Sequence, residues 1–300
     1  TKDYVLGLEV VLPTGEVIRT GARTAKSVAG YDLTKLMVGS EGTLGIATRI
    51  IVKLLPLPES VRTLSAFFST IESAAAAASS IIAGRILPRA LELVDQAALR
   101  AVEGYLKQDL SSGAAAMLIV EVDGPIESTA RDIGRVEELM TRAGAMRVAR
   151  AETEVEREQI WKARRAISPA LYTIKPKKVN EDIVVPRSKI PDILRAINEI
   201  AKRHDLLIVN FGHAGDGNIH TNIMIDEDEA ERAEIAVKEI FEETLRLGGS
   251  ISGEHGIGLS KARYLPMELG AAALGVMKKI KSTLDPNNIL NPGKIFLNAE

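Results

Sequence analysis

The chain has 300 residues, of which 46% are hydrophobic and 26% are charged, and its formal net charge at pH 7 is −2. These values are ordinary for a globular protein and leave room for two domains. Nucleic acid is not expected as a partner, because phosphate binding depends on a clustered basic excess that this chain lacks. No apolar run approaches the roughly 18 residues of a membrane span, so an integral membrane protein is not expected either.

The sequence contains no cysteine, which excludes disulfides and iron–sulfur clusters held by this chain. This composition fits a reducing compartment and favours a cytoplasmic location. The amino terminus begins Thr1-Lys2-Asp3 and shows neither an initiator methionine nor the features of a secretion signal. We therefore interpret the sequence as part of a longer protein.

The first 57 residues predict a small β-rich segment. An apolar run, a Pro-Thr-Gly turn and an alternating run predict a hairpin over residues 5–20. A short helix is expected after Gly30, with Asp32 as its N-cap, and a strand is expected over 46–55. The loop 38–46 contains three glycines and leaves backbone amides free for a phosphate or for the edge of a cofactor. A tight turn that enters the next strand explains this loop equally well.

Two prolines, Pro56 and Pro58, mark a domain boundary, because neither can donate a hydrogen bond to a sheet. Strands and helices alternate beyond this boundary, which predicts an α+β arrangement. The alanine run at 74–78 predicts close helix packing. The expected strands are 61–69, 90–94, 114–123, 145–150 and 179–185, and the expected helices are 70–83, 95–107, 126–143, 153–173, 189–204, 228–247 and 268–283.

The predicted helix over 153–173 carries the only tryptophan, Trp161, with Arg164 three residues later on the same face. An arginine held near an aromatic ring can bind a carboxylate through two hydrogen bonds. A solvated basic face explains Arg164 equally well. The last helix is followed by Asp-Pro and Asn-Pro-Gly turn signals, which predict a compact loop at the carboxyl end.

Three of the four histidines fall in two glycine-rich segments, at 210–220 and 252–258. An apolar run precedes the first segment and an alternating run follows it, so a strand–turn–strand unit is expected to bring His213 and His220 together. Glu254 and His255 come from the second segment. Two imidazoles and one carboxylate suit a catalytic divalent ion such as zinc, manganese or iron. A single histidine in a loop usually satisfies a hydrogen bond, but three of four in such loops favour the metal, whereas His204 at a helix end fits a surface role.

Four segments together resemble the FAD-linked oxidases of the vanillyl-alcohol-oxidase type, in the branch of the glycolate oxidase FAD subunit and of D-lactate and D-2-hydroxyglutarate dehydrogenases. They are residues 39–46, 212–220, 253–258 and 290–294, and they occur in the family's order over the whole chain.

The resemblance implies three segments of an α+β fold. Residues 1–57 correspond to the C-terminal part of an FAD-binding domain. Residues 58–284 correspond to a cap, or substrate, domain with a large antiparallel sheet flanked by helices, and residues 285–300 return to the flavin side. The N-terminal part of the FAD domain, with its pyrophosphate loop, is not in this sequence. We therefore expect the 300-residue chain by itself to fold and to bind metal without retaining FAD.

The resemblance also implies a function, the FAD-dependent oxidation of a D-2-hydroxyacid of the glycolate or lactate type to the 2-oxoacid, with metal assistance and hydride transfer to flavin N5. His213, His220 and Glu254 become metal ligands, and His255 becomes the general base. Arg164 and Lys178 would bind the substrate carboxylate. The residues that would face the flavin are Gly39, Ser40, Glu41, Gly42, Thr43, Gly45, Ile46, Asn291 and Lys294.

An iron–sulfur or other electron-transfer subunit is the expected partner, and it could hold the protein at the periphery of a membrane. Two other functions stay open at this point. A metal-dependent hydrolase would use the same ligands, but it gives no role to residues 39–46 or 291–294. A non-catalytic subunit of an oxidase complex would keep the fold, but none of the expected ligands has been lost.

Overall fold

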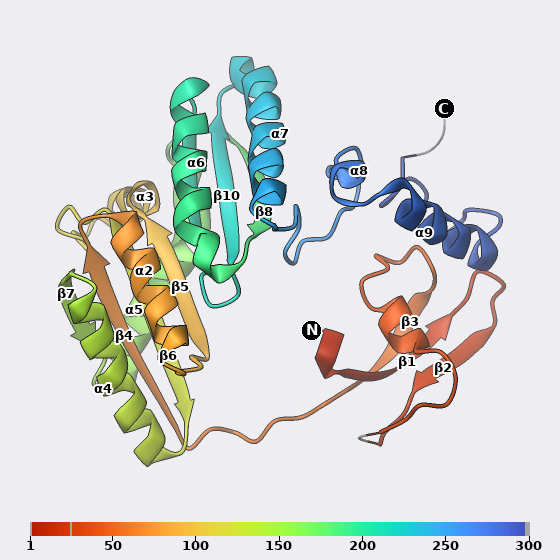
Figure 1. The fold of residues 1–300 in the computed structure, drawn as a ribbon, viewed down its shortest axis with the longest axis horizontal. Helices are drawn as coiled ribbons and strands as arrows, with labels where there is room; N and C mark the ends of the chain where they lie inside the picture. The colour runs from red at the N-terminus through yellow and green to blue at the C-terminus, as the bar shows by residue number, and fades with distance from the viewer. Residues whose placement is uncertain (1, 25, 298–300) are drawn as a thin grey trace. The chain divides into compact units, whose positions relative to one another are not determined.

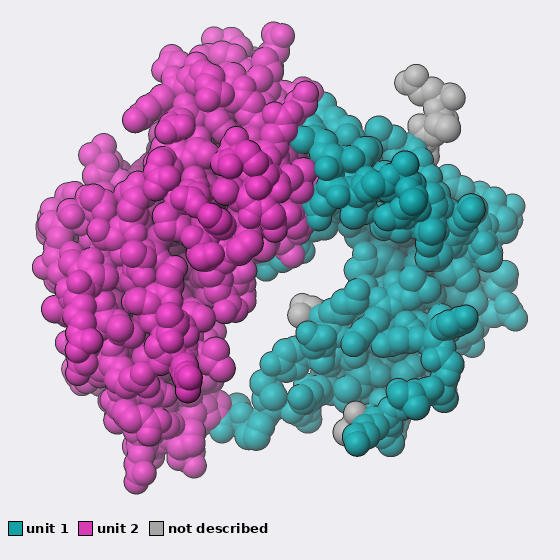
Figure 2. Space-filling view, viewed as in Figure 1, with its two compact units in different colours: residues 1–57, 254–300 teal, residues 58–253 magenta. Residues whose placement is uncertain are grey.

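The computed structural model describes residues 2–24 and 26–297 and contains two compact units, Thr1–Leu57 with Glu254–Glu300, and Pro58–Gly253. Figures 1 and 2 show the ribbon and the two units. Residues 1, 25 and 298–300, which belong to the first and last predicted segments, lie outside the described residues. The second unit ends at Gly253, whereas we expected the cap to continue to 284. The assignment of these units to FAD and cap domains stays a prediction.

The first unit contains a three-stranded antiparallel sheet with the order β2-β1-β3. Its strands are β1 (Val5–Val11), β2 (Val17–Gly21) and β3 (Ile46–Val52), and a 3-10 helix, η1 (Lys2–Tyr4), precedes them. Strands β1 and β2 form the predicted hairpin. The short helix α1 (Leu33–Met37) begins as expected after Asp32, whose Oδ1 accepts a hydrogen bond from Lys35 N at 2.9 Å.

The C-terminal part of the first unit contains two helices, α8 (Leu265–Glu268) and α9 (Ala271–Leu284). The single helix predicted over 268–283 is therefore wrong at its start, because the chain is extended at Leu269 and α9 has Gly270 as its N-cap. Residues Ile280 and Leu284 of α9 pack against the small core of the unit, which consists of Leu8, Val10, Met37 and Leu44.

The second unit is built on a seven-stranded antiparallel sheet with the order β7-β4-β6-β5-β9-β10-β8. The predicted α+β class with a large antiparallel sheet flanked by helices is confirmed. The strands are β4 (Ser60–Phe68), β5 (Ala90–Asp95), β6 (Ala116–Gly124), β7 (Ala145–Arg150), β8 (Lys177–Val184), β9 (Leu207–His213) and β10 (Asn218–Ile225). The helices are α2 (Ile71–Ala83), α3 (Gln96–Leu106), α4 (Ile126–Arg142), α5 (Glu154–Leu171), α6 (Ile190–Arg203) and α7 (Ala230–Arg246), with 3-10 turns η2 (Arg187–Lys189) and η3 (Glu227–Glu229).

Helices cover both faces of this sheet. Helices α2, α4, α6 and α7 lie over one face, and α3 and α5 lie over the other (Figure 1). The alanine run of α2 is packed closely as expected, because Ala74, Ala75, Ala77 and Ala78 are each at most 2% exposed. Within the described ranges, no helix is long and apolar enough to cross a membrane.

The face covered by α3 and α5 carries the residues of interest. Val94 of β5 and Phe211 of β9 pack in the core with these helices. Side chains alternate between the two faces along a strand. Glu92 is two residues from Val94 on β5, and His213 is two residues from Phe211 on β9, so Glu92 and His213 point to this same face. The register also pairs Glu92 with His213 and Phe211 with His220. Strand pairing therefore brings the polar side chains of β5, β9 and β10 together on the α5 side of the sheet.

Candidate functional site

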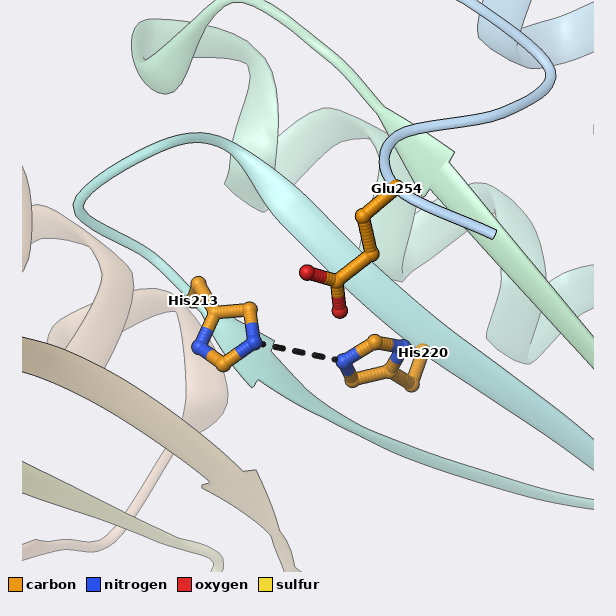
Figure 3. A group of neighbouring side chains, drawn as sticks. All are labelled: His213, His220 and Glu254. Carbon is orange, nitrogen blue, oxygen red and sulfur yellow. Dashed lines mark hydrogen bonds between the residues drawn. The ribbon is translucent and has the colours of Figure 1, made fainter. Parts of the chain in front are cut away.

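The hairpin of β9 and β10 brings two histidines together, as the strand–turn–strand pattern predicts. His213 pairs with Asn218, and His220 pairs with Phe211, so the two imidazoles are diagonal neighbours on one face. Their Nε2 atoms lie 3.5 Å apart, and the rings are nearly perpendicular at 84° (Figure 3). The turn requires glycine at position 217, where φ is +79° and a Cβ would lie 2.0 Å from Val185 O.

The carboxylate of Glu254 reaches the same place because the chain before it is anchored to the sheet. Gly253 N donates to Oδ2 of Asp182 at 2.9 Å, and Asp182 is fully buried opposite His220 on β8. A Cβ at Gly253 would lie 2.7 Å from the side chain of Asn218, so only glycine permits this close approach. Glu254 follows directly, and its carboxylate points toward the imidazoles in Figure 3.

These three side chains fit a divalent metal ion. One ligand atom from each of His213, His220 and Glu254 lies within 4.8 Å of the other two. The 3.5 Å between the imidazole nitrogens is close to the spacing that two ligands of one tetrahedral ion have at bond lengths of about 2.1 Å. His220 is buried, His213 is half-buried and Glu254 is exposed. Whether an ion binds here stays a prediction.

Arg164, which the sequence predicts to bind the substrate carboxylate, is bonded to a carboxylate of the protein. Its Nε and Nη2 atoms lie 2.8 and 2.7 Å from Oε2 of Glu92. The aromatic ring beneath its guanidinium is Phe211, at 4.6 Å, while Trp161 donates its indole N–H to Glu121. The guanidinium therefore has fewer donors left for a substrate than the sequence suggests.

Glu92 is one of two residues beside this site that the sequence did not indicate. It is only 4% exposed, and its second oxygen, Oε1, lies 2.5 Å from Nδ1 of His213. Burial works to raise the pKa of this carboxyl, but the hydrogen bond with His213 and the positive charge of Arg164 outweigh it and leave the pKa below its usual range. Glu92 therefore stays ionised between a cation and a candidate ligand.

Lys178, the other predicted carboxylate-binding residue, has no acidic partner among the described residues. It lies on the same face of the sheet as Asp182, four residues along β8. Its Nζ donates to Ser168 Oγ at 2.9 Å and lies 5.2 Å from the ring of Tyr172. Burial lowers the pKa of Lys178, as it does when the charge of an ammonium is not compensated. An anion beside Lys178 would supply that compensation.

Asn222 lies two residues beyond His220 on the same face and was also missed. Its Nδ2 donates to the carbonyls of Val209 and His220, and the side chain is fully buried. Its Oδ1 has no hydrogen-bond partner in the part of the chain that the structure describes. Buried polar atoms are usually satisfied, so this oxygen points to a missing donor. The alternation of residues 218–225 was the available signal.

In the first unit, most of the residues that are predicted to face the flavin lie around the glycine-rich loop 39–46. A cavity of about 520 Å³ is lined by the predicted flavin-facing residues Ser40, Glu41, Gly42, Gly45, Ile46 and Asn291, but Gly39, Thr43 and Lys294 are not among its lining residues. The carboxylate of Glu41 accepts hydrogen bonds from Ile257 N at 2.8 Å and from Gly258 N at 2.7 Å. Asn291 Nδ2 donates to Glu41 O at 2.6 Å. Glu41 therefore links the glycine-rich loop to residues 257–258 and to Asn291.

Lys281 of α9 also contacts this glycine-rich loop. Its Nζ donates to the carbonyls of Thr43 and Leu290, both at 2.9 Å, and also contacts the buried Asp285. Asp285 in turn accepts from the backbone amides of Ile289 and Leu290. The turn signals at the carboxyl end thus produce a compact loop beside residues 39–46, as expected.

His255 directly follows Glu254 and belongs to the first unit, where its side chain is exposed. Its assignment as the general base depends on this sequence neighbour and on the family resemblance, and it stays a prediction.

Comparison with known proteins identifies the class of this fold. The solved structure of p-cresol methylhydroxylase with bound substrate superimposes with a TM-score of 0.77, over 99% of this chain and 65% of that chain, at 15% identity. The family model described as FAD linked oxidases, C-terminal domain, matches residues 57–295, and the chain belongs to this family. The predicted resemblance to the vanillyl-alcohol-oxidase type is confirmed.

Relatives in the glycolate oxidase and D-lactate dehydrogenase branch confirm that part of the resemblance as well. The chain is 50% identical to the glycolate oxidase subunit GlcD of Bacillus subtilis over 99% of its own length. It is 35% identical to a D-lactate dehydrogenase of Anaerostipes hadrus over 98% of its length. The chain spans only 64% of the length of each of these two relatives.

Proposed function

We propose that the protein to which this chain belongs oxidises a D-2-hydroxyacid of the glycolate or lactate type to the 2-oxoacid, with FAD and one divalent ion. The observation that carries the proposal is the convergence of His213, His220 and Glu254, whose ligand atoms lie within 4.8 Å of one another. The family of FAD-linked oxidases and the names of the relatives support the flavin and the substrate class. A hydrolase would use the same three ligands but would give no role to the cavity around residues 39–46.

When bound, the ion would lower the pKa of the substrate's α-hydroxyl group, and the flavin would accept the hydride from the α-carbon. His213, His220 and Glu254 would hold the ion and leave its exposed side open to the substrate. His255 would take the proton from the hydroxyl group.

Lys178 and Asn222 would orient the substrate on the sheet. Lys178 lacks an acidic partner among the described residues, so it is better suited to the substrate carboxylate than Arg164, which is bonded to Glu92. The unsatisfied Oδ1 of buried Asn222 would accept a hydrogen bond from the substrate or from Lys178. Both side chains lie on the face of the sheet that carries His220.

We also propose that the protein passes electrons to a partner subunit with its own redox group. The Bacillus subtilis relative is named as a subunit of glycolate oxidase. These 300 residues contain no cysteine, so any iron–sulfur cluster would be held outside them.

Replacing Lys178 with methionine is expected to raise KM for glycolate or D-lactate by roughly 10- to 100-fold, which corresponds to the loss of a charged hydrogen bond worth about 1.5–3 kcal/mol. Steady-state kinetics of the flavin-loaded protein would measure this change. Lys177→Met is the matched control, because Lys177 is the preceding residue on β8 and pairs with Glu227. Equal KM values for the two variants would show that Lys178 does not bind the substrate.

A further inference from the structure

The carboxylate of Glu92 contacts both a candidate metal ligand, His213, and a largely buried arginine, Arg164. We infer that Glu92 is a positioning residue that fixes the ring of His213 for metal binding and keeps Arg164 beside it. Nothing in the sequence indicated this role, since Glu92 and His213 are 121 residues apart. The inference rests on the proposed function only in that His213 is taken to bind a metal ion.

The first step concerns the tautomer of His213. An ionised carboxylate can only accept hydrogen bonds, so Oε1 of Glu92, at 2.5 Å, requires a proton on Nδ1 of His213. A neutral imidazole with its proton on Nδ1 has a free lone pair on Nε2. That nitrogen is the one 3.5 Å from Nε2 of His220, on the side where Glu254 lies (Figure 3). Glu92 thus selects the form of His213 that can bind a metal ion at this position.

The second step concerns the orientation of Glu92 itself. Arg164 places two donors, Nε and Nη2, on the same oxygen, Oε2, at 2.8 and 2.7 Å. This contact leaves Oε1 for His213 and prevents the carboxylate from rotating away. The guanidinium lies over Phe211, whose ring centroid is 5.5 Å from that of His220. The side chains of Arg164 and Glu92 are 13% and 6% exposed, so water competes little for these bonds. Arg164 would therefore act on the metal site through Glu92.

The test is the affinity of the flavin-loaded protein for Mn²⁺, measured by competition with a chelator after removal of bound metal. Glu92→Gln should bind Mn²⁺ about 10- to 100-fold more weakly, the usual effect of losing an outer partner of a ligand. The glutamine amide has one acceptor oxygen and one donor NH₂ group, whereas Arg164 and Nδ1–H of His213 are both donors. The amide can therefore accept a hydrogen bond from only one of these two neighbours, and its NH₂ group would face the other. Arg164→Met should weaken Mn²⁺ binding in the same direction.

Glu121→Gln is the matched control. Glu121 lies on β6, the strand next to β5, is also 4% exposed, and is bonded to Arg157 and Trp161. This variant should lose a comparable amount of thermal stability and should bind Mn²⁺ as the unsubstituted protein does. Equal Mn²⁺ affinity in Glu92→Gln and Glu121→Gln would overturn the inference, whereas failure of the unsubstituted protein to bind Mn²⁺ would instead remove the proposed metal site.

A measurement on the unsubstituted, metal-free protein keeps the inference testable if Glu92→Gln does not fold. Nitrogen-15 NMR of labelled histidine distinguishes the two tautomers, and His213→Gln identifies the signal of His213. A proton on Nδ1 of His213 is the expected result. A proton on Nε2 would contradict the role of Glu92.

Discussion

Replacing His220 with alanine is expected to weaken divalent-metal binding by more than about 100-fold, because the loss of an outer partner alone typically costs 10- to 100-fold. It should also lower kcat/KM for the 2-hydroxyacid by about three orders of magnitude, equivalent to about 4 kcal/mol of transition-state stabilisation. The physical reason is that His220 supplies one of three converging ligand atoms, and alanine cannot bind a metal ion through its side chain. Elemental analysis and steady-state kinetics of the flavin-loaded protein would measure the two effects.

His204→Ala is the control for this substitution. His204 lies in the same compact unit as His220, at the end of α6. Its side chain is 15% exposed and contacts Glu239 of α7. Its removal should leave metal content and turnover unchanged. Full metal content and full activity in His220→Ala would show that the three side chains do not form a functional metal site.

Replacing His255 with asparagine is expected to lower kcat by roughly 10²- to 10⁴-fold, the usual contribution of a positioned general base. Metal content should stay the same, because the proposed ligands His213, His220 and Glu254 are intact. Turnover and metal analysis on the same preparation would separate the two roles.

Two other outcomes would be informative for His255. Unchanged turnover would remove the assignment of this residue as the base. A loss of metal in parallel with turnover would indicate that His255 supports the ligand set instead, since it follows Glu254 directly.

The local part of the site could be predicted from the sequence. The apolar run, the glycine-rich turn and the alternating run indicate a hairpin, and the hairpin by itself brings His213 and His220 to 3.5 Å. Asp32 likewise caps α1 as expected from its place before the helix. These features depend on residues close in sequence, whose periodicity and turn chemistry are readable without a structure.

The long-range part could not be predicted from residue patterns. Glu92 contacts His213 only because β5 pairs with β9. The periodicity of the sequence predicts strands, but it does not indicate which strands are neighbours in the sheet. Asp182 anchors Gly253 across 71 residues of separation, and Glu41 holds Gly258 across 217. The family resemblance grouped residues 39–46 with Asn291, but it did not indicate that the Glu41 carboxylate binds backbone amides.

The protein partners of Arg164 could not be predicted for the same reason, and its role in substrate binding stays a prediction. Its spacing from Trp161 correctly indicates neighbours on one helix face, yet the ring beneath the guanidinium is Phe211, which belongs to a strand. The buried carboxylate that satisfies Arg164 lies 72 residues earlier in the chain. A charged side chain that is expected to bind a substrate can thus also be hydrogen-bonded to another side chain of the protein, which only the tertiary structure reveals.

The most direct test of the proposed function is the metal dependence of flavin reduction in the full protein. The protein would be loaded with FAD, freed of divalent metal with a chelator and mixed anaerobically with D-lactate or glycolate, while the flavin absorbance at about 450 nm is followed. We expect the absorbance to persist without metal and to be lost rapidly once Mn²⁺ or Zn²⁺ is restored to His213, His220 and Glu254. Loss of the absorbance at an equal rate in the metal-free protein would contradict the proposed role of the metal ion.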